Sequence, residues 1–506
     1  MPTFLRRSGF VFAWALALPT LAAAAPGAGT PKPSVERAAA RIAQALATVQ
    51  QTPNSFPAYS AVFVHGADER WIYVNGRVRE DRPTPADADT LFYIASQTKS
   101  FMGLLAAELD RKGVFPLDTT LAQVWPKLAL PAPVDPARVT MTDLLSHQEG
   151  LRTDTLNVVT AYVRDIPPAD YPRLLASETR ARDPGFRYAN LGDLVYGAAL
   201  EARTGRNWRD WLDAEVLGPL ALDHVVSRPS RADAATLSWN HQWDGSRWHT
   251  LPPKPDALMH AAGGLLASSN DMARWMRANL RPGKAGTPID AGALRLAQRP
   301  IAKADLADRE IDCNGYSLGW YTCTYKGQRA LMHPGSYTGA VSVTVLVPSA
   351  DAGMAVMVNS DSATEGLELD LMKAFIGLVT GQPGEQARLD KAVASYPARL
   401  AAKTRGRLDA IAKARARPEW KGWAWHPAGP ALQAFTGRFH NALFGAMEVS
   451  EVDGRLQASI GAMRLALEPA RPGLFGATSG PIEPPEPLRF DAARRSIRWN
   501  GQVFTR

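Results

Sequence analysis

Cysteine is almost absent from this chain: Cys313 and Cys323 are the only two among 506 residues. The pair lacks CxxC spacing and no histidine lies between its members, so the sequence predicts neither a structural zinc site nor any other metal site here. In an oxidising compartment, two cysteines this close in the chain can form a disulfide across a local loop or hairpin. Two unpaired buried thiols are the alternative, and the spacing does not decide between them.

Long apolar runs are also lacking. No stretch beyond the first residues approaches the ~20 apolar residues of a membrane-spanning helix, so no stable membrane span is expected. At the start, Arg6 and Arg7 precede the apolar run Phe10–Leu18 and the small residues Ala22–Ala25. This order is typical of a cleaved export signal. We expect residues 1–24 to be a signal peptide, cut after Ala24, and the mature protein to be periplasmic or secreted.

Outside one segment, the chain has little net charge of either sign. The formal charge is +8, but residues 386–417 alone hold nine Lys or Arg and two Asp. A nucleic-acid-binding fold needs a basic face with aromatic platforms, and this distribution does not predict one, so no nucleic-acid partner is expected. The basic segment reads as a solvated helical face, with an anionic cell-envelope surface as the weaker alternative. The oligomeric state is left open.

The order of the expected elements indicates an α+β fold. Helical periodicity covers Ser34–Gln50, and strand patterns follow at Ser60–His65 and Trp71–Val74, with a turn signal at Asn75-Gly76. The middle of the chain is mainly helical. Strand patterns then return at Tyr316–Tyr325, Arg329–His333, Ala340–Val347 and Gly353–Asn359, before a closing helix at Leu367–Val379. This order predicts one antiparallel sheet built from both ends of the region, with a helical insert.

We divide the chain into four parts. The signal peptide covers residues 1–24 and the main α+β domain residues 25–380. A basic helical linker, broken near Pro397, covers residues 381–430. Residues 431–506 are expected to form a small all-β domain. Its strand patterns lie at Thr436–His440, Ala446–Val452, Leu456–Ile460 and Ser496–Trp499.

Ser96 and Lys99 form the first candidate for chemistry. They stand three residues apart where the strand-like run Leu91–Ile94 meets a helical pattern, and positions i and i+3 of a helix share a face. A serine hydroxyl is a weak nucleophile until a neighbouring base takes its proton. The positive field of a helix N-terminus favours an oxyanion and discourages a charged ammonium, which would help Lys99 accept a proton. Alone, this spacing also arises by chance.

Tyr188 and Asn190 form the second candidate. They follow the turn at Pro184-Gly185 and precede a helical pattern, and residues two apart on extended backbone point the same way. A phenol beside an ammonium would have its anion stabilised, so Tyr188 could act as a base. The tyrosine and asparagine of Tyr73-Val74-Asn75 have the same spacing within an expected hairpin strand, where a structural role is the better interpretation. Only context separates the two.

His333 and Gly335 form the third candidate, at the end of an expected strand. A histidine followed by glycine suits the close passage of a substrate backbone, although most single histidines are structural. Ser336 follows directly.

Taken together, these motifs resemble the serine β-lactamase-related family, which includes class C β-lactamases, DD-peptidases and related esterases. Their order matches, and so do three flanking segments: VTMTDLLSHQEGL at Val139–Leu151, PGFRYANLGDLVYGAALEARTG at Pro184–Gly205 and AAGGLLASSNDMARWMRANL at Ala261–Leu280. The resemblance spans Ser34 to Val379 and implies a β-lactamase/transpeptidase-like fold. The tail from Phe435 resembles the lipocalin-like β-barrel appended to some members.

The resemblance implies a role for each candidate residue. Ser96 would be acylated, with Lys99 and Tyr188 sharing the general-base and general-acid duties. Asn190 would hold a substrate amide or carbonyl, and His333 stands where many relatives carry a lysine. The backbone N–H groups of Ser96 and Ser336 would form the oxyanion hole. No cofactor is implied, and the partner would be a small-molecule or peptide substrate.

The histidine at position 333 separates this chain from relatives that bind penicillin, in which the lysine helps hold the substrate carboxylate. A histidine with an ordinary pKa near ~6.5 is largely neutral at pH 7. We therefore expect an exported serine hydrolase that favours peptides or amides, with D-amino-acid-containing peptides as one class. A carboxylesterase or a weak β-lactamase is the alternative within this chemistry. A non-catalytic relative that binds cell-wall fragments is the alternative outside it.

Overall fold

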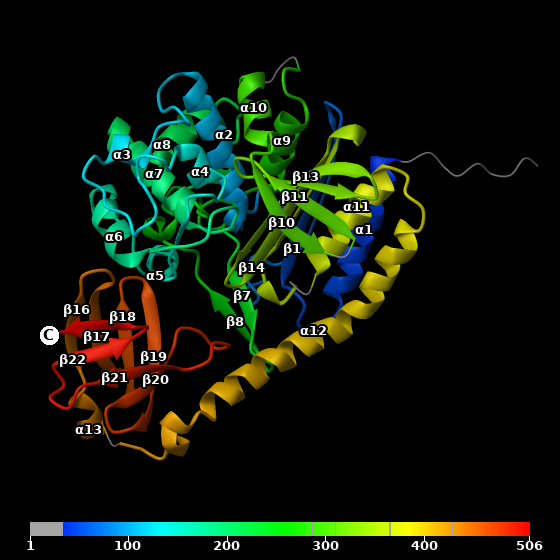
Figure 1. The fold of residues 1–506 in the computed structure, drawn as a ribbon. Coiled ribbons are helices and arrows are strands. Elements are labelled where there is room, and N and C mark those ends of the chain that lie inside the picture. Colours follow the sequence, from blue (N-terminus) through cyan, green and yellow to red (C-terminus); the bar gives the residue numbers. More distant parts are fainter. Residues whose placement is uncertain (1–33, 285–287, 309, 364–365, 428) are drawn as a thin grey trace, which may run out of the picture.

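The computed structural model describes residues 34–506 apart from 285–287, 309, 364–365 and 428, so the expected signal peptide lies outside the described residues. An eight-stranded antiparallel sheet has helices on both faces, and a separate β-barrel follows it (Figure 1). The strand order is β10-β11-β12-β13-β14-β15-β1-β2. The bounds are β10 Ala302–Asp308, β11 Ile311–Tyr316, β12 Tyr321–Tyr325, β13 Gln328–Tyr337, β14 Ala340–Val347, β15 Ala352–Val358, β1 Ala58–His65 and β2 Glu69–Gly76.

The two ends of this region meet inside the sheet. β1 pairs antiparallel with β15, with Tyr59 opposite Val358 and His65 opposite Ala352. β14 and β15 are buried along their whole length, because helices cover both faces. The expected sheet built from both ends, with a helical insert, is therefore confirmed.

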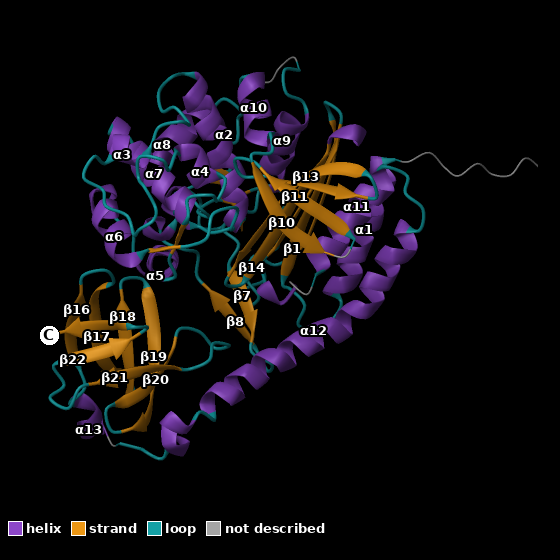
Figure 2. Ribbon diagram, in the orientation of Figure 1, coloured by secondary structure: helices purple, strands orange, loops and turns teal. Residues whose placement is uncertain are grey.

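Two layers of helices close the core on either side of the sheet (Figure 2). On one face lie α1 (Val35–Gln50), α11 (Leu367–Val379) and the first part of α12 (Glu385–Arg415). The insert covers the other face, where α9 packs on β1 and β15. Its helices are α2 Thr98–Arg111, α3 Leu121–Val124, α4 Met141–Leu145, α5 Thr155–Val158, α6 Tyr171–Glu178, α7 Leu191–Thr204, α8 Trp208–Leu212, α9 Ser269–Leu280 and α10 Ala291–Gln298.

Three small sheets lie in the insert or beside it. They consist of β3 Phe92–Tyr93, β9 Leu266–Ala267 and β6 Val225–Val226; of β4 Leu151–Arg152 and β5 Arg180–Ala181; and of β7 Asn240–Trp243 and β8 Trp248–Leu251. The first sheet matters for function, because β3 leads directly to Ser96.

The C-terminal region is a closed barrel of eight strands, β16 to β23 in chain order, preceded by α13 (Gly429–Gln433). Aromatic side chains fill its interior. The rings of Phe435, Phe475 and Phe490 contact one another with centroids 5.0–5.7 Å apart. The strands are β16 Gly437–Asn441, β17 Gly445–Val452, β18 Arg455–Ile460, β19 Met463–Arg471, β20 Leu474–Thr478, β21 Glu486–Phe490, β22 Ser496–Trp499 and β23 Gln502–Thr505.

Three local expectations were wrong. Asn75-Gly76 is not a turn: it ends β2, pairing with Tyr59 and Ala58, and the hairpin turns at Gly66 instead. A Cβ on Gly76 would lie 2.0 Å from the Pro57 carbonyl oxygen, so close backbone approach explains this glycine.

The other two errors concern where elements break. The segment 316–325 is not one strand, because Gly319 (φ +99°) turns the chain between β11 and β12. Pro397 does not interrupt the linker helix, since α12 runs through it from Glu385 to Arg415. A proline removes a single backbone donor, and the remaining turns of a 31-residue helix carry it past that gap.

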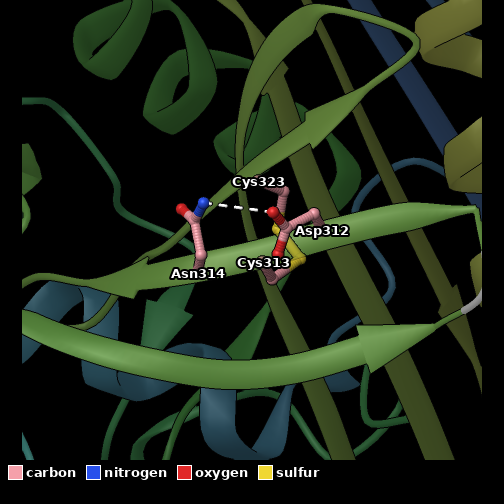
Figure 3. The surroundings of a disulfide bond; sticks show 4 residues. All are labelled: Asp312, Cys313, Asn314 and Cys323. Atoms are coloured by element: carbon pink, nitrogen blue, oxygen red, sulfur yellow. Dashed lines mark hydrogen bonds between the residues drawn. A yellow bond between two sulfur atoms is a disulfide. The ribbon is translucent and has the colours of Figure 1, made fainter.

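Cys313 on β11 and Cys323 on β12 form a disulfide that joins these neighbouring strands (Figure 3). Both side chains are buried, and Asn314 donates a hydrogen bond to Asp312 beside them at 3.1 Å. Within the described part of the chain, no helix is both long and apolar enough to cross a membrane.

Candidate active site

Ser96 lies at a sharp junction between a strand and a helix. β3 ends at Tyr93, a helical turn (η1, Ala95–Gln97) carries Ser96, and α2 begins at Thr98. Ala95 has φ +48°, a left-handed conformation that costs a residue with a side chain about 1 kcal/mol or more. The strained turn leaves Ser96 half-buried while its neighbours Ala95 and Gln97 are buried.

The Lys99 ammonium is the centre of the polar contacts around Ser96. Its Nζ lies 3.3 Å from Ser96 Oγ, 2.8 Å from Asn190 Oδ1 and 2.7 Å from the Ala262 carbonyl oxygen. The side chain is buried in the first turn of α2, one turn beyond Ser96. The contacts with Asn190 and Ala262 therefore fix the ammonium beside the Ser96 hydroxyl.

Burial acts strongly on the proton affinity of Lys99. Desolvation lowers its pKa well below the ordinary value, and the Asp193 carboxylate partly offsets this. The carboxyl of Asp193 is itself buried in α7, which raises its pKa, while Lys99 acts to lower it. The lowered pKa makes a neutral amine at Lys99 accessible near neutral pH.

Tyr188 closes the group from the loop before α7. The Lys99 Nζ lies 4.9 Å from the centre of its ring, and Ser96 is near enough to the phenol to act on its pKa. The side chain keeps 37% of its surface exposed, so it lines the open side of the site. Burial of the phenol end raises its pKa, and the neighbouring Ser96 side chain lowers it by less. The expected stabilised phenolate is therefore wrong, because desolvation is the larger effect.

Asn190 stands at the N-cap of α7, half-buried. Its side chain makes no capping hydrogen bond and instead accepts one from Lys99. Its amide nitrogen is thereby oriented away from the ammonium.

β13 supplies the other wall of the site. Gln328–Met332 pairs with β12 on one side, but from His333 to Tyr337 the strand pairs only with β14. The face of β13 at Gly335 lies against the turn that carries Ser96: a Cβ on Gly335 would stand 2.1 Å from the Ile94 carbonyl oxygen. Only glycine permits this approach. Ser336 follows, exposed, with its backbone on the edge that β12 leaves unpaired.

His333 is fully buried and both of its ring nitrogens are occupied. Nδ1 lies 2.7 Å from the Pro334 carbonyl oxygen, so it carries the proton and donates it. Nε2 then accepts from the Tyr316 hydroxyl at 3.2 Å. Burial lowers the pKa of His333 to about 3, so the ring is neutral. His333 lies beneath the Tyr188 ring, with centroids 5.9 Å apart, and contributes neither charge nor a free donor to this site.

His147 packs against the ring of Tyr188. Its ring centre lies 4.7 Å from those of both Tyr188 and Tyr316, and its pKa is lowered well below the ordinary value by burial. Neither ring nitrogen has a hydrogen-bond partner among the described residues. These contacts indicate a structural role for His147.

The structure thus brings Ser96, Lys99, Tyr188 and Asn190 together, with Gly335 and Ser336 on the facing edge. Sequence reasoning missed two participants, Asp193 and the Ala262 carbonyl. Asp193 carried a usable signal, since it stands three residues after Asn190 on the same helix face. Nothing in the sequence marks a backbone carbonyl. Among the described residues, no group of three or more His, Cys, Asp or Glu side chains could hold a metal ion.

Comparison with known proteins identifies the family of this chain. A family model described as Beta-lactamase matches residues 38–377. Penicillin-binding protein 4 of Amycolatopsis lactamdurans is 26% identical over 357 residues, covering 67% of this chain and 88% of that protein. Unguisins hydrolase ungD of Aspergillus violaceofuscus is 23% identical over 342 residues, covering 59% of this chain and 58% of that protein.

Two solved structures share the fold along nearly the whole chain. The octameric penicillin-binding protein homologue from Pyrococcus abyssi superposes with a TM-score of 0.59 at 17% identity, covering 94% of this chain and all of that one. SurE with D-Leu gives a TM-score of 0.53 at 19% identity, with the same coverage. At these identities the likeness concerns the fold alone. The family match spans two thirds of the sequence and includes every residue assembled around Ser96, and the chain belongs to the Beta-lactamase family.

Proposed function

We propose that this protein is an exported serine hydrolase that forms an acyl-enzyme on Ser96. The observation that carries the proposal is the buried Lys99 ammonium, bonded to Ser96 Oγ at 3.3 Å and lowered in pKa by burial. A neutral amine in hydrogen-bond contact with a hydroxyl is a competent base for it. The family and the relatives named above support acyl-enzyme chemistry in general.

The first half-reaction cleaves the substrate bond. Ser96 Oγ attacks the carbonyl carbon, and its proton passes to the neutral Lys99 amine. The backbone N–H groups of Ser96 and Ser336 donate hydrogen bonds to the oxyanion that forms. The Tyr188 phenol, kept protonated by its raised pKa, donates to the leaving nitrogen as the carbon–nitrogen bond breaks, and Lys99 returns a proton to it. The amine leaves and the acyl group stays on Ser96.

The second half-reaction uses water. A water molecule replaces the leaving amine, gives its proton to the same Lys99–Tyr188 pair and attacks the ester carbon. The Ser96 ester bond breaks as the pair passes that proton to Ser96 Oγ, the acid leaves and the Ser96 hydroxyl is restored. Asn190, fixed by Lys99, is oriented to hold a substrate carbonyl or amide throughout.

Peptides and amides are the substrate class that we propose. A neutral His333 with both nitrogens engaged supplies no charge for the carboxylate of a lactam antibiotic, which argues against strong β-lactamase activity. One relative is named a hydrolase, the unguisins hydrolase, which supports hydrolysis in general. Within the peptide class we propose small peptides that contain D-amino acids. An ester substrate is the second candidate, because the same acyl-enzyme serves both.

Fluorophosphonate labelling tests the core of the proposal. The wild type should be labelled at Ser96, and Ser96→Ala should lose labelling and hydrolysis together, whereas Ser349→Ala, at an exposed turn, should keep both. A wild type that binds cell-wall fragments but takes up no label would make it a non-catalytic binding protein. Turnover of D- and L-peptides, esters and lactams by enzyme that takes up the label then ranks the substrate classes. Faster turnover of lactams than of peptides would contradict the peptide assignment.

Export is a separate proposal. It draws on the signal-like start of the sequence, and a disulfide between Cys313 and Cys323 suits an oxidising compartment. Fractionation of the producing cells, with N-terminal sequencing of the mature protein, tests it. A start at Ala25 in the envelope or medium is expected, and an uncleaved cytosolic protein would refute export.

A further inference from the structure

A cavity of about 490 Å³ lies between the barrel and the hydrolase region. The hydrolase region contributes Tyr162, Gln242, Lys254 and Tyr337 to its wall, among others. The barrel contributes residues from three turns at one end: Ala462–Arg464, Ser479–Glu483 and Trp499-Asn500. The cavity therefore exists only because the barrel is docked.

The docking of the barrel is specific. The backbone N–H of Ala462 donates to the Val163 carbonyl at 2.8 Å, and a Cβ on Gly461 would stand 2.1 Å from that same oxygen. Arg164 Nε donates to the Leu443 carbonyl on the same end of the barrel at 3.0 Å. Because aromatic rings fill the barrel interior, its contribution to ligand binding is confined to this rim.

Lys254 is an unusual member of the cavity wall. It is only 8% exposed, and none of the described carboxylates lies within ion-pair distance of it. Its Nζ donates to the Tyr93 hydroxyl at 3.3 Å and stands 4.3 Å from the centre of the Tyr337 ring. An ammonium has three donors, so this cation keeps donors free for a ligand. Burial without a counter-charge lowers the pKa of Lys254 to about 7, and a bound anion would restore the full ammonium charge and relieve that cost.

Two further wall residues carry buried polar atoms with no partner in the described structure. Gln242, 2% exposed, donates through Nε2 to Asp361, but its Oε1 accepts nothing. Trp499 is also buried, and its indole N–H has no acceptor. Buried polar groups are nearly always satisfied, so two orphans in one wall beside a lone cation indicate a missing polar ligand.

The cavity is connected to the reacting serine through two tyrosines. Tyr337 follows Ser336, whose N–H is expected in the oxyanion hole, and its ring centre lies 5.1 Å from that of Tyr93. Tyr93 stands three residues before Ser96 and donates to the Gly263 carbonyl, next to the Ala262 carbonyl that holds Lys99. A substrate lying along the free edge of β13 would reach the cavity directly after Ser336.

We propose that this cavity binds the anionic end of an acylated amino acid or peptide that carries a bulky apolar side chain. Lys254 takes the carboxylate, Gln242 and Trp499 pair with an amide, and the tyrosine faces and prolines around the cavity receive the side chain. The inference rests on the proposed function for the direction of the substrate, but its binding chemistry stands on the cavity alone.

Binding of N-acetylphenylalanine, measured by calorimetry for each enantiomer beside its primary amide, tests the site. On the wild type, at least one enantiomer should bind about tenfold or more tightly than its amide, and Lys254→Met should abolish that preference while changing amide affinity less than about twofold. Ser479→Trp should block both ligands by filling the cavity from the barrel side. Ser450→Trp, on an exposed barrel position away from the cavity, should block neither.

Equal affinity for acid and amide on the wild type, or a preference that survives in Lys254→Met, would overturn the proposal. Fluorophosphonate labelling of Ser96 is recorded on the same variants and should persist in Lys254→Met. Labelling without the carboxylate preference removes only the cavity site. The preference without any labelling removes only the hydrolase assignment.

Discussion

Lys99 Nζ lies 3.3 Å from Ser96 Oγ, and the same ammonium is held by the Asn190 side chain and the Ala262 backbone. One buried cation therefore ties together three segments that are distant in the chain.

Lys99→Met should lower kcat/KM by about 10²–10⁴, because it removes the base and keeps the apolar stem. Lys99→Arg should not restore activity, since a guanidinium stays protonated at any working pH. Steady-state kinetics on the best substrate of the panel measure both. Lys391→Met, on the exposed face of α12, is the matched control and should behave as wild type. Activity in Lys99→Arg close to that of the wild type would rule out a proton-accepting lysine.

Tyr188→Phe should reduce kcat by about 10²-fold or more with a smaller change in KM, because the ring still covers Lys99 while the donor to the leaving group is lost. Tyr73→Phe is the control: it removes the phenol from the other tyrosine that stands two residues before an asparagine, on β2. An ester with a good leaving group should suffer less than an anilide. Equal losses for both substrates would contradict a general-acid role.

Asp193→Asn should move the acidic limb of the kcat/KM profile to lower pH. The Asp193 carboxylate acts to raise the pKa of Lys99, so its removal lets that pKa fall, and the neutral amine then persists at lower pH. The pH profile of kcat/KM is measured together with the thermal unfolding midpoint of the variant. An unchanged midpoint shows that a shift of the acidic limb does not come from unfolding. A limb that stays in place would mean that Asp193 is already protonated in the active enzyme.

Gly335→Ala should destabilise the fold by about 1–3 kcal/mol and impair activity, because its Cβ would stand 2.1 Å from the Ile94 carbonyl oxygen. Gly406→Ala in α12 is the matched control: its Cβ would meet nothing within 4 Å, so it should stabilise by about 0.5–1 kcal/mol. Urea unfolding measures both. A neutral Gly335→Ala would mean that β13 and the Ser96 turn can separate freely.

His241→Gln should flatten the acid side of the stability profile. Burial lowers the pKa of His241 to about 4, so below its unfolded value near ~6.5 the unfolded chain binds a proton that the folded one does not. Stability due to this histidine is present above that pH and falls by about 1.4 kcal/mol per unit down to pH ~4. Glutamine can replace its contacts with Glu80 N–H and the Asn359 carbonyl.

Unfolding free energies at pH 4.5 to 8 provide the check. Wild type and His241→Gln should run parallel above pH 7, which is the internal control, and diverge below pH 6. Parallel curves over the whole range would show that His241 titrates alike in both states.

The sequence by itself determined most of the elements and placed the candidate residues Ser96 and Lys99 on one helix face. Periodicity placed α11 at Leu367–Val379 and β14 at Ala340–Val347 with their observed bounds, because local patterns of burial repeat with the period of the element. The spacing of Ser96 and Lys99 on one helix face was likewise local. Where a residue's role depends on distant backbone, as at Gly76 against Pro57, the local signal misled.

Only the tertiary structure determined the charge states of the buried side chains and the cavity between the barrel and the hydrolase region. Desolvation sets the protonation of Lys99, Tyr188 and His333, and it depends on every element packed around them rather than on their neighbours in the chain. Asp193 and the Ala262 carbonyl joined the site through the same packing. The cavity beside Lys254 forms only when the barrel, whose lining residues begin at Ala462, packs against the hydrolase region. No local sequence pattern encodes a contact over that separation.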